Sequence, residues 1–352
     1  MTFYGGPGHG VLALVESPAQ LLNVIELAQL EDDLVGIKIA VLAPVAGLTR
    51  KQLRCIIPIA REAGHTVSWH EPRLGSLAVA RSLRALAGDL AGVRRLVVGD
   101  PYSGVIQAII GVTKLSEVTI VDDGTATLEF ARQWVAGEHL LRWHRIATPS
   151  QRRQVTALAR DQVSGTVRRR LSPQSACRLR LFTCMPVDLP GVRTIRNDFS
   201  WLRARYSAPE VKSSADLVGT SLVESGVVKA DCYLDAVETL TTRYEVDRYF
   251  VHRKEADWKL DLIERMGIQV VRPSLPLEII ARRGPVGSTI VSFPSTVVHT
   301  LPIVLAESEA RVVICEIPNE WYEPEKTVQA DNFLGRVTTS ARRSYGLATV
   351  AC

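Results

Sequence analysis

The sequence predicts an α/β protein built from two Rossmann-like halves that face each other across a cleft. Short apolar, β-branched runs alternate with amphipathic helical patterns, which is typical of a parallel sheet covered by helices on both faces. An arginine-rich stretch interrupts this alternation near the middle of the chain, and the alternation then resumes. The length of 352 residues suits two domains. We therefore expect a first domain at residues 1–180 and a second at 181–352, whose C-terminal helix can cross back.

The first predicted domain shows the alternation clearly. Its first apolar run, Val11 to Val15, is typical of a buried strand, and Ser17 and Pro18 suit the N-cap and first position of a helix. Further strands are predicted at residues 37–42, 65–69, 95–98 and 118–121, and further helices at 49–63, 77–90, 106–110 and 125–134. Each helix therefore connects two strands of one parallel sheet.

In the second predicted domain, polar clusters follow the strand patterns. Gly219 and Thr220 follow a strand that ends at Val218, and His252 follows a run that contains Tyr249. Ligands of open parallel sheets bind beyond the carboxyl ends of the strands. A loop of small residues and a histidine at such positions could contact a nucleotide. Further strand patterns end near residues 272, 291 and 316, and helical patterns cover 233–244 and the tail through Arg343.

Three further polar side chains favour the same interpretation. Glu278 could accept a hydrogen bond from a ribose, and Ser295 and Thr296 open a helix whose N-terminus favours an anion. His252 would then face a phosphate. The structural alternatives are a first-turn acid for Glu278, a plain N-cap for the hydroxyls and a core position for the histidine. The joint placement after successive strands favours nucleotide binding.

Two adjacent carboxylates, Asp122 and Asp123, follow the strand predicted at 118–121 and precede Gly124. Their mutual repulsion, together with partial burial, would raise the pKa of one of them and make it a general base. The alternative is a turn in which an aspartate caps the next helix, since Asp-Gly pairs are common in turns. The residues alone leave both interpretations open.

Composition excludes several classes of protein. A net charge of +5 is too small to indicate a nucleic-acid partner. The six cysteines include no Cys-x-x-Cys pair, so neither a zinc site nor a disulfide framework is predicted. No apolar run approaches the roughly 20 residues of a membrane span, and residues 1–10 lack the pattern of a secretory signal. We expect a cytoplasmic protein with reduced thiols.

Arginines crowd the stretch at residues 142–180. Between Trp143 and Arg180 nine arginines face one acid, Asp161. Such a block is typical of a helical arm that contacts anionic lipid or polyanionic glycan, which would place the protein at the inner face of the plasma membrane, and equally of a solvated surface helix. Aromatic residues are too few there to indicate nucleic-acid stacking. Residues 182–206 are expected to hold one or two strands and the crossing between the domains.

Four stretches resemble the bacterial sialyltransferases, especially the polysialyltransferase and lipooligosaccharide sialyltransferase families. Residues Glu16 to Asn23 are similar to the first strand-to-helix turn of these families, and Asp122-Asp123-Gly124 to their acidic-acidic-glycine motif. Residues Tyr249 to Glu255 are similar to their His-Pro motif, and Ser295-Thr296 to their paired hydroxyls, with Glu278 between them. Each motif is short, but together they are spread over nearly the whole chain.

The resemblance implies a GT-B fold that binds an acceptor in the N-terminal half and a CMP-activated sugar in the C-terminal half. It implies inversion at the anomeric carbon, with no metal ion and no cofactor. On the matching positions, Asp123 would be the general base, and His252 would stabilise or protonate the leaving phosphate. The resemblance also implies that Ser295 and Thr296 contact the phosphate and that Glu278 contacts the ribose. Gly219 and Thr220 would contact the nucleotide. Glu16, Ser17 and Asp122 would contact the acceptor.

Arg253 stands where these families have proline. Either Arg253 meets the carboxylate of the donor sugar or the donor differs, so Kdo or another nonulosonate joins sialic acid as a candidate. We therefore expect an inverting glycosyltransferase that moves such a sugar from its CMP donor to a hydroxyl of a glycan or glycolipid. The alternatives are a GT-B transferase or epimerase for a UDP- or GDP-sugar, with Arg253 and Lys254 at the diphosphate, and a non-catalytic glycan-binding relative.

Overall fold

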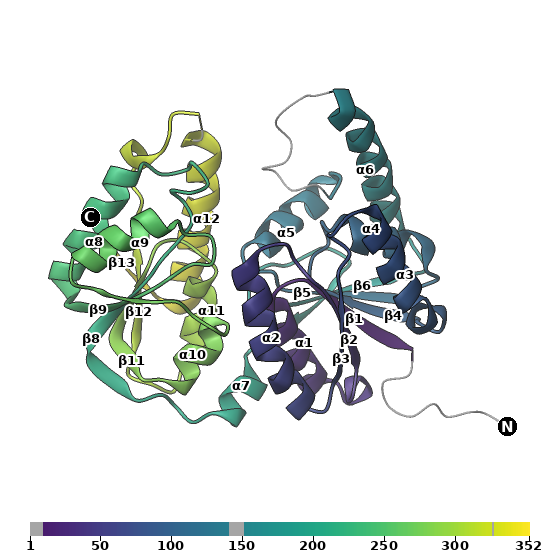
Figure 1. Cartoon of the computed structure of the whole chain (residues 1–352), viewed down its shortest axis with the longest axis horizontal. Helices are drawn as coiled ribbons and strands as arrows, with labels where there is room; N and C mark the ends of the chain where they lie inside the picture. Colours follow the sequence, from purple (N-terminus) through teal and green to yellow (C-terminus); the bar gives the residue numbers. More distant parts are fainter. Residues whose placement is uncertain (1–9, 141–150, 326) are drawn as a thin grey trace. The chain divides into compact units, whose positions relative to one another are not determined.

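The chain forms two compact units, Met1–Asn197 and Asp198–Cys352, in a computed structural model that describes residues 10–140, 151–325 and 327–352 (Figure 1). Each unit is a parallel sheet with helices packed on it, so the predicted pair of Rossmann-like domains, the composition of a GT-B fold, is confirmed. The division expected after residue 180 falls inside a strand of the first sheet. The two units divide between Asn197 and Asp198 instead, because the last two strands of that sheet follow the arginine-rich stretch.

The first sheet has seven strands in the order β3-β2-β1-β4-β5-β6-β7. All its pairings are parallel, and the order reverses between β1 and β4, which is the topology of a doubly wound sheet. Buried aliphatic runs form the central strands and leave their carboxyl ends at one edge. The strands are β1 (Val11–Val15), β2 (Lys38–Leu42), β3 (Thr66–His70), β4 (Arg95–Val98), β5 (Glu117–Val121), β6 (Arg178–Thr183) and β7 (Arg193–Arg196).

Helices cover both faces of this sheet (Figure 1). The face that carries Leu12, Leu14 and Leu96 packs under α3 (Ser76–Ala91), α4 (Gly104–Val112), α5 (Ala126–Ala136) and α6 (Gln151–Arg170). On the other face, α1 (Pro18–Leu30) and α2 (Gly47–Glu62) pack against each other. Ser17 caps α1 as predicted: its hydroxyl accepts from the backbone N–H of Gln20, and Pro18 opens the helix.

Several arginines of the basic stretch bind within the first unit. The guanidinium of Arg168 lies 4.2 Å from the centroid of the Trp134 ring, and Arg170 donates to the carbonyl oxygens of Ile110 and Thr113 at the end of α4. Arg180 pairs with Glu117 and Glu31. These contacts stabilise the unit and do not support a lipid-binding role for the three arginines. Residues 141–150, and the side chains of 151–160, lie outside the described residues, so anionic-surface contact by the rest of the block stays a prediction.

The second sheet has six parallel strands in the order β10-β9-β8-β11-β12-β13. Helices α8 (Ala230–Tyr244) and α9 (Asp257–Arg265) pack on the face that carries Leu217 and Tyr249. The remaining helices are α7 (Ser200–Arg205), α10 (Leu277–Arg283), α11 (Val297–Val304) and α12 (Thr327–Tyr345), of which α12 packs against α11 within this unit. The strands are β8 (Val211–Val218), β9 (Val246–Phe250), β10 (Gln269–Val271), β11 (Val286–Ser292), β12 (Arg311–Cys315) and β13 (Ala348–Val350).

The edge strand β13 brings together two cysteines that are far apart in the sequence. Because β13 pairs in parallel with β12, the thiol sulfurs of Cys315 and Cys352 lie 3.2 Å apart, although the two residues are 37 positions apart in the chain. Both thiols are reduced in this structure. Across the described parts of both units, none of the helices combines the length and the apolar character that a membrane span requires.

Candidate functional site

The predicted site residues lie at the carboxyl ends of strands in both sheets. In the first unit, Glu16 and Ser17 follow β1, and Asp122 and Asp123 follow β5. In the second unit the residues follow four neighbouring strands: Gly219 and Thr220 follow β8, His252 follows β9, Glu278 follows β10, and Ser295 and Thr296 follow β11. Parallel pairing thus gathers each group at one edge of its own sheet.

Ser17 and Asp123 meet in the first unit. The Ser17 hydroxyl lies 3.4 Å from Oδ1 of Asp123, to which it donates, while the same hydroxyl caps α1. Asp123 is half-buried and follows β5 at the carboxyl edge of the sheet. A carboxylate oriented by a hydroxyl at a strand end can accept a proton from a bound hydroxyl group.

Glu16 is buried beside this pair and is held by residues from other loops. Its carboxylate forms an ion pair with Arg73 and accepts a hydrogen bond of 2.6 Å from the Ser103 hydroxyl. Burial raises the pKa of Glu16, and the neighbouring Asp100 adds to this while Arg73 and Ser103 oppose it. Arg73 and Ser103 were missed by the sequence interpretation because they belong to loops after β3 and β4 that carry no motif.

Asp122 points into the protein. Its carboxylate accepts from the hydroxyls of Thr127 and Thr183, at 2.8 and 2.5 Å, and from the backbone N–H of Cys184 at 2.7 Å. Burial is the largest cause of its raised pKa, and these three donors oppose the shift. The pKa of one carboxylate of the pair is therefore raised, with burial as its largest cause, and a contribution from repulsion by Asp123 stays a prediction. The contacts of Asp122 fix the loops after β5 and β6, and its acceptor contact stays a prediction.

His252 sits in a tight turn between β9 and α9. Its backbone N–H donates to Oε2 of Glu255 at 2.5 Å, and its ring Nδ1 accepts from the backbone N–H of Lys254 at 3.4 Å. Burial lowers the pKa of His252 to about 4, and the charges of Arg253, Lys254 and Lys259 add to this. The imidazole is therefore neutral at pH 7, with its proton on Nε2, where it can be donated to an acceptor such as a phosphate oxygen.

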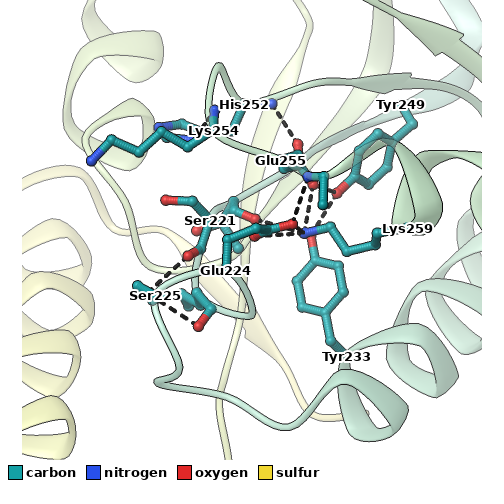
Figure 2. A network of polar contacts seen from close by, with 12 residues as sticks. Ser221, Glu224, Ser225, Tyr233, Tyr249, His252, Lys254, Glu255 and Lys259 are labelled. Atoms are coloured by element: carbon teal, nitrogen blue, oxygen red, sulfur yellow. Dashed lines mark hydrogen bonds and ion pairs between the residues drawn. The ribbon is translucent and has the colours of Figure 1, made fainter. Parts of the chain in front are cut away.

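A buried cluster of five side chains lies beneath this turn: Glu224, Tyr233, Tyr249, Glu255 and Lys259, hereafter the Lys259 cluster (Figure 2). The Lys259 ammonium is fully buried and lies 2.8 Å from Oε1 of Glu255 and 3.0 Å from Oε1 of Glu224. It also lies 4.4 Å from the centroid of the Tyr233 ring. Tyr249 joins the cluster, because its hydroxyl lies 2.7 Å from that of Tyr233 and donates to Glu255.

The Lys259 cluster explains Gly219. A Cβ at this position would lie 2.4 Å from Oε2 of Glu255 and 2.5 Å from the Tyr249 hydroxyl. Glycine is therefore required for packing against Glu255 and Tyr249. The loop of small residues was expected to let a ligand approach the backbone closely. At Gly219 the side chains of Glu255 and Tyr249 occupy that space instead. Contact of Gly219 and Thr220 with a nucleotide stays a prediction.

The other predicted donor residues are tied to their own surroundings. Glu278 is buried in the first turn of α10 and accepts from the Thr300 hydroxyl at 2.8 Å; burial is the largest cause of its raised pKa. The Ser295 hydroxyl lies 3.2 Å from that of Ser292. Thr296 occupies the N-cap position of α11, as the structural alternative expected, although its side chain makes no capping hydrogen bond.

Within residues 10–140, 151–325 and 327–352, no three His, Cys, Asp or Glu side chains are grouped so that they could hold a metal ion.

No protein-family model and no curated protein matches the chain. Among solved structures, it is similar to an α/β-galactoside α-2,3-sialyltransferase from the luminous marine bacterium Photobacterium phosphoreum, with 11% identity over 96% of this chain and 98% of that chain, and a TM-score of 0.49. It is also similar to the heptosyltransferase WaaC of E. coli, with 12% identity over 89% of this chain and 90% of that chain, and a TM-score of 0.40. A glycosyl transferase of family 9 from Veillonella parvula shows 8% identity over 97% and 98% of the two chains, with a TM-score of 0.40. At these values the likeness carries no argument about activity, which rests on the residues of this chain.

The division of roles between the two adjacent carboxylates predicts different effects on stability. Asp122→Ala leaves two hydroxyls and a backbone N–H without their acceptor, and we expect it to lower the free energy of unfolding by about 3 kcal/mol or more. Asp123→Ala, at the half-buried neighbour, should lower it by about 1 kcal/mol or less. Urea denaturation followed by circular dichroism measures both. Equal losses for the two variants would contradict the structural role of Asp122.

The surroundings of His252 predict its titration. In the ligand-free protein its imidazole should titrate near pH 4, in place of the ordinary value of 6.5. The unfolded chain takes up this proton near pH 6.5, so the histidine favours folding above that pH, and the contribution is lost as the pH falls from 6.5 towards 4. NMR of the ring carbon resonances, assigned with His252→Gln, measures the midpoint. A midpoint at 6.5 or above would refute the partly buried, neutral state of this imidazole.

Proposed function

We propose that the protein is an inverting glycosyltransferase that acts without a metal ion. It transfers a sialic acid, or a related nonulosonate such as Kdo, from its CMP-activated form to a hydroxyl of a glycan or glycolipid. The observation that carries this proposal is the turn after β9. It carries a neutral histidine, whose Nε2 bears the proton, at the carboxyl end of β9, and the next two residues are the exposed cations Arg253 and Lys254.

The proposed chemistry in the first unit uses Asp123. The acceptor hydroxyl attacks the anomeric carbon while its proton passes to the Asp123 carboxylate. The Ser17 hydroxyl, 3.4 Å from Oδ1, orients that carboxylate. A CMP-linked sugar acid carries a good leaving group, so a carboxylate of ordinary strength can serve as the base. Glu16 is held by Arg73 and Ser103, and it supports the loop that carries Ser17.

The second unit would receive the leaving group. As the bond between the anomeric carbon and the phosphate oxygen breaks, negative charge grows on the phosphate of CMP. The Nε2–H of His252 donates to that oxygen, and the hydroxyls of Ser295 and Thr296 donate to the others. Arg253 and Lys254 add positive charge, and Arg253 meets the carboxylate of the sugar. Glu278 accepts from the ribose, which requires its buried carboxylate to exchange the Thr300 hydroxyl for a ribose hydroxyl.

A second candidate is a GT-B transferase or epimerase that uses a UDP- or GDP-sugar. The observation that favours it is the pair of exposed cations, Arg253 and Lys254, beside the histidine. A diphosphate brings more negative charge than the phosphodiester of a CMP-sugar, and two cations could balance it. A non-catalytic glycan-binding protein is the third candidate, and it would need neither Asp123 nor His252.

A nucleotide panel separates these candidates. We expect CMP to raise the melting temperature by several degrees, because RT ln(1 + [L]/Kd) exceeds about 2 kcal/mol at 100 times the Kd. UMP, UDP and GDP should raise it less. Differential scanning fluorimetry with all four nucleotides makes the measurement. A larger shift with UDP or GDP would replace the first candidate by the second, and no shift with any nucleotide would favour the third.

The role of Asp123 predicts a separation of binding from chemistry. Asp123→Asn removes the proton acceptor and should reduce the rate of sugar transfer at least about 100-fold, while CMP affinity stays within about twofold. Release of CMP from the activated donor in the presence of acceptor measures the rate, and calorimetry measures the affinity. Asp89→Asn is the matched control, since Asp89 pairs with Lys38 at the opposite, amino-terminal edge of the same sheet. Undiminished transfer by Asp123→Asn would remove Asp123 from its role.

A further inference from the structure

The Lys259 ammonium joins three segments of the second unit that are separate in the sequence. It extends from α9 and donates to the carbonyl oxygen of Thr220 at 2.9 Å, in the loop after β8. In the same loop it pairs with Glu224, and in the turn after β9 it pairs with Glu255 (Figure 2). The ammonium therefore contacts both loops that carry predicted nucleotide contacts.

The carboxylates of Glu224 and Glu255 link the Lys259 ammonium to the backbone of the His252 turn. Glu255 uses Oε1 for Lys259 and Oε2 for the backbone N–H of His252. Glu224 uses Oε1 for Lys259 and accepts from the backbone N–H of Ala256, 3.0 Å away, just before α9. A single carboxylate therefore links the buried ammonium to the backbone at each end of the turn that holds the histidine.

Burial makes this connection rigid. The Lys259 and Glu255 side chains are fully buried, so water cannot replace their partners without opening the cluster. Removing one partner of a buried ion pair leaves an uncompensated charge, which is costly. The ring of Tyr233 also packs against the ammonium, and the Tyr249 hydroxyl donates to Glu255. These contacts hold the loop after β8 and the turn after β9 in one arrangement relative to each other.

From this geometry we propose that Lys259 is a positioning residue of the donor half-site: through Glu224 and Glu255 it fixes the loop at residues 219–224 to the His252 turn, and so sets where the His252 ring meets the phosphate of the nucleotide. This inference rests on the proposed function in one respect, namely that a nucleotide phosphate is the ligand. The connection itself is a property of the ligand-free protein and can be measured without a ligand.

A lysine that only stabilised the fold would act differently. Its loss would loosen the unit as a whole and would have no particular effect on two amide hydrogens. The structure instead assigns the connection to the backbone N–H groups of His252 and Ala256, each of which donates to a carboxylate that Lys259 holds. The hydrogen-exchange rates of these two amides, compared with those of β8 and β11, therefore distinguish positioning from general stabilisation.

The experiment compares Lys259→Met with Lys229→Met in the full chain. Lys229 is the matched control, because it also donates to a backbone carbonyl oxygen of this unit, that of Glu320 at 2.7 Å, but at the surface. We expect Lys259→Met to speed hydrogen exchange at the His252 and Ala256 amides at least about tenfold, and to weaken CMP binding at least about tenfold, which is 1.4 kcal/mol. Lys229→Met should change neither by more than about twofold.

The two measurements separate the possible failures. Unchanged exchange at the two amides overturns the connection. Faster exchange with unchanged CMP affinity overturns the positioning of the phosphate contact. Failure of the wild-type protein to bind CMP contradicts the proposed function, while the exchange measurement still tests the connection. If Lys259→Met does not fold, Glu224→Gln serves in its place: it weakens only the link to residues 219–224 and should speed exchange at Ala256 more than at His252.

Discussion

Parallel strand pairing is the constraint on which the rest of the structure depends. In both sheets of the described chain, the paired strands run in one direction, so each loop that follows a strand emerges at the same edge. This is why Ser17 and Asp123 come within 3.4 Å although 106 positions separate them. It is also why the loops after β8 and β9 are close enough for one lysine to hold both. The predicted site residues are brought to strand ends by the fold before any specific contact forms.

Burial then decides which of these polar side chains can meet a ligand. Asp122 and Asp123 are adjacent, yet Asp122 still belongs to the sheet, since its N–H donates to the carbonyl of Phe182, and its side chain turns under the loop after β6. Asp123 lies one residue beyond and stays half-buried at the edge. Glu278 shows the same separation of position from accessibility, because it follows the expected strand but points at Thr300. Position in the fold is thus necessary for a site residue and does not suffice.

The sequence predicted those parts of the fold that depend on local patterns. Buried strands and the capped first helix follow from apolar runs and from Ser17-Pro18, and their pattern is visible without tertiary contacts. One or two strands were expected within residues 182–206, but their bounds were not, because the edge strand β7, Arg-Thr-Ile-Arg, has no buried run; the division was placed after residue 180, inside β6. Lys259 was missed for a related reason: within a helix pattern a lysine reads as a surface residue, and only contacts with Thr220 and Glu224, 39 and 35 positions away, show that it is buried.

The distribution of charge in the second unit explains how the turn after β9, which has Arg253 and no proline after the histidine, can keep its geometry. A proline would rigidify the segment after His252 through its own ring, and Arg253 supplies no such constraint. The Lys259 cluster supplies the missing rigidity from below, because Glu255 holds the His252 N–H and is itself held by Lys259 and Tyr249. Arg253 and Lys254 are exposed on this turn, while the fixed element is the neutral histidine. In the proposed reaction, His252 is thus a hydrogen-bond donor of fixed position, and Arg253 and Lys254 are cations whose side chains adapt. This arrangement suits a leaving group whose negative charge grows as its bond breaks.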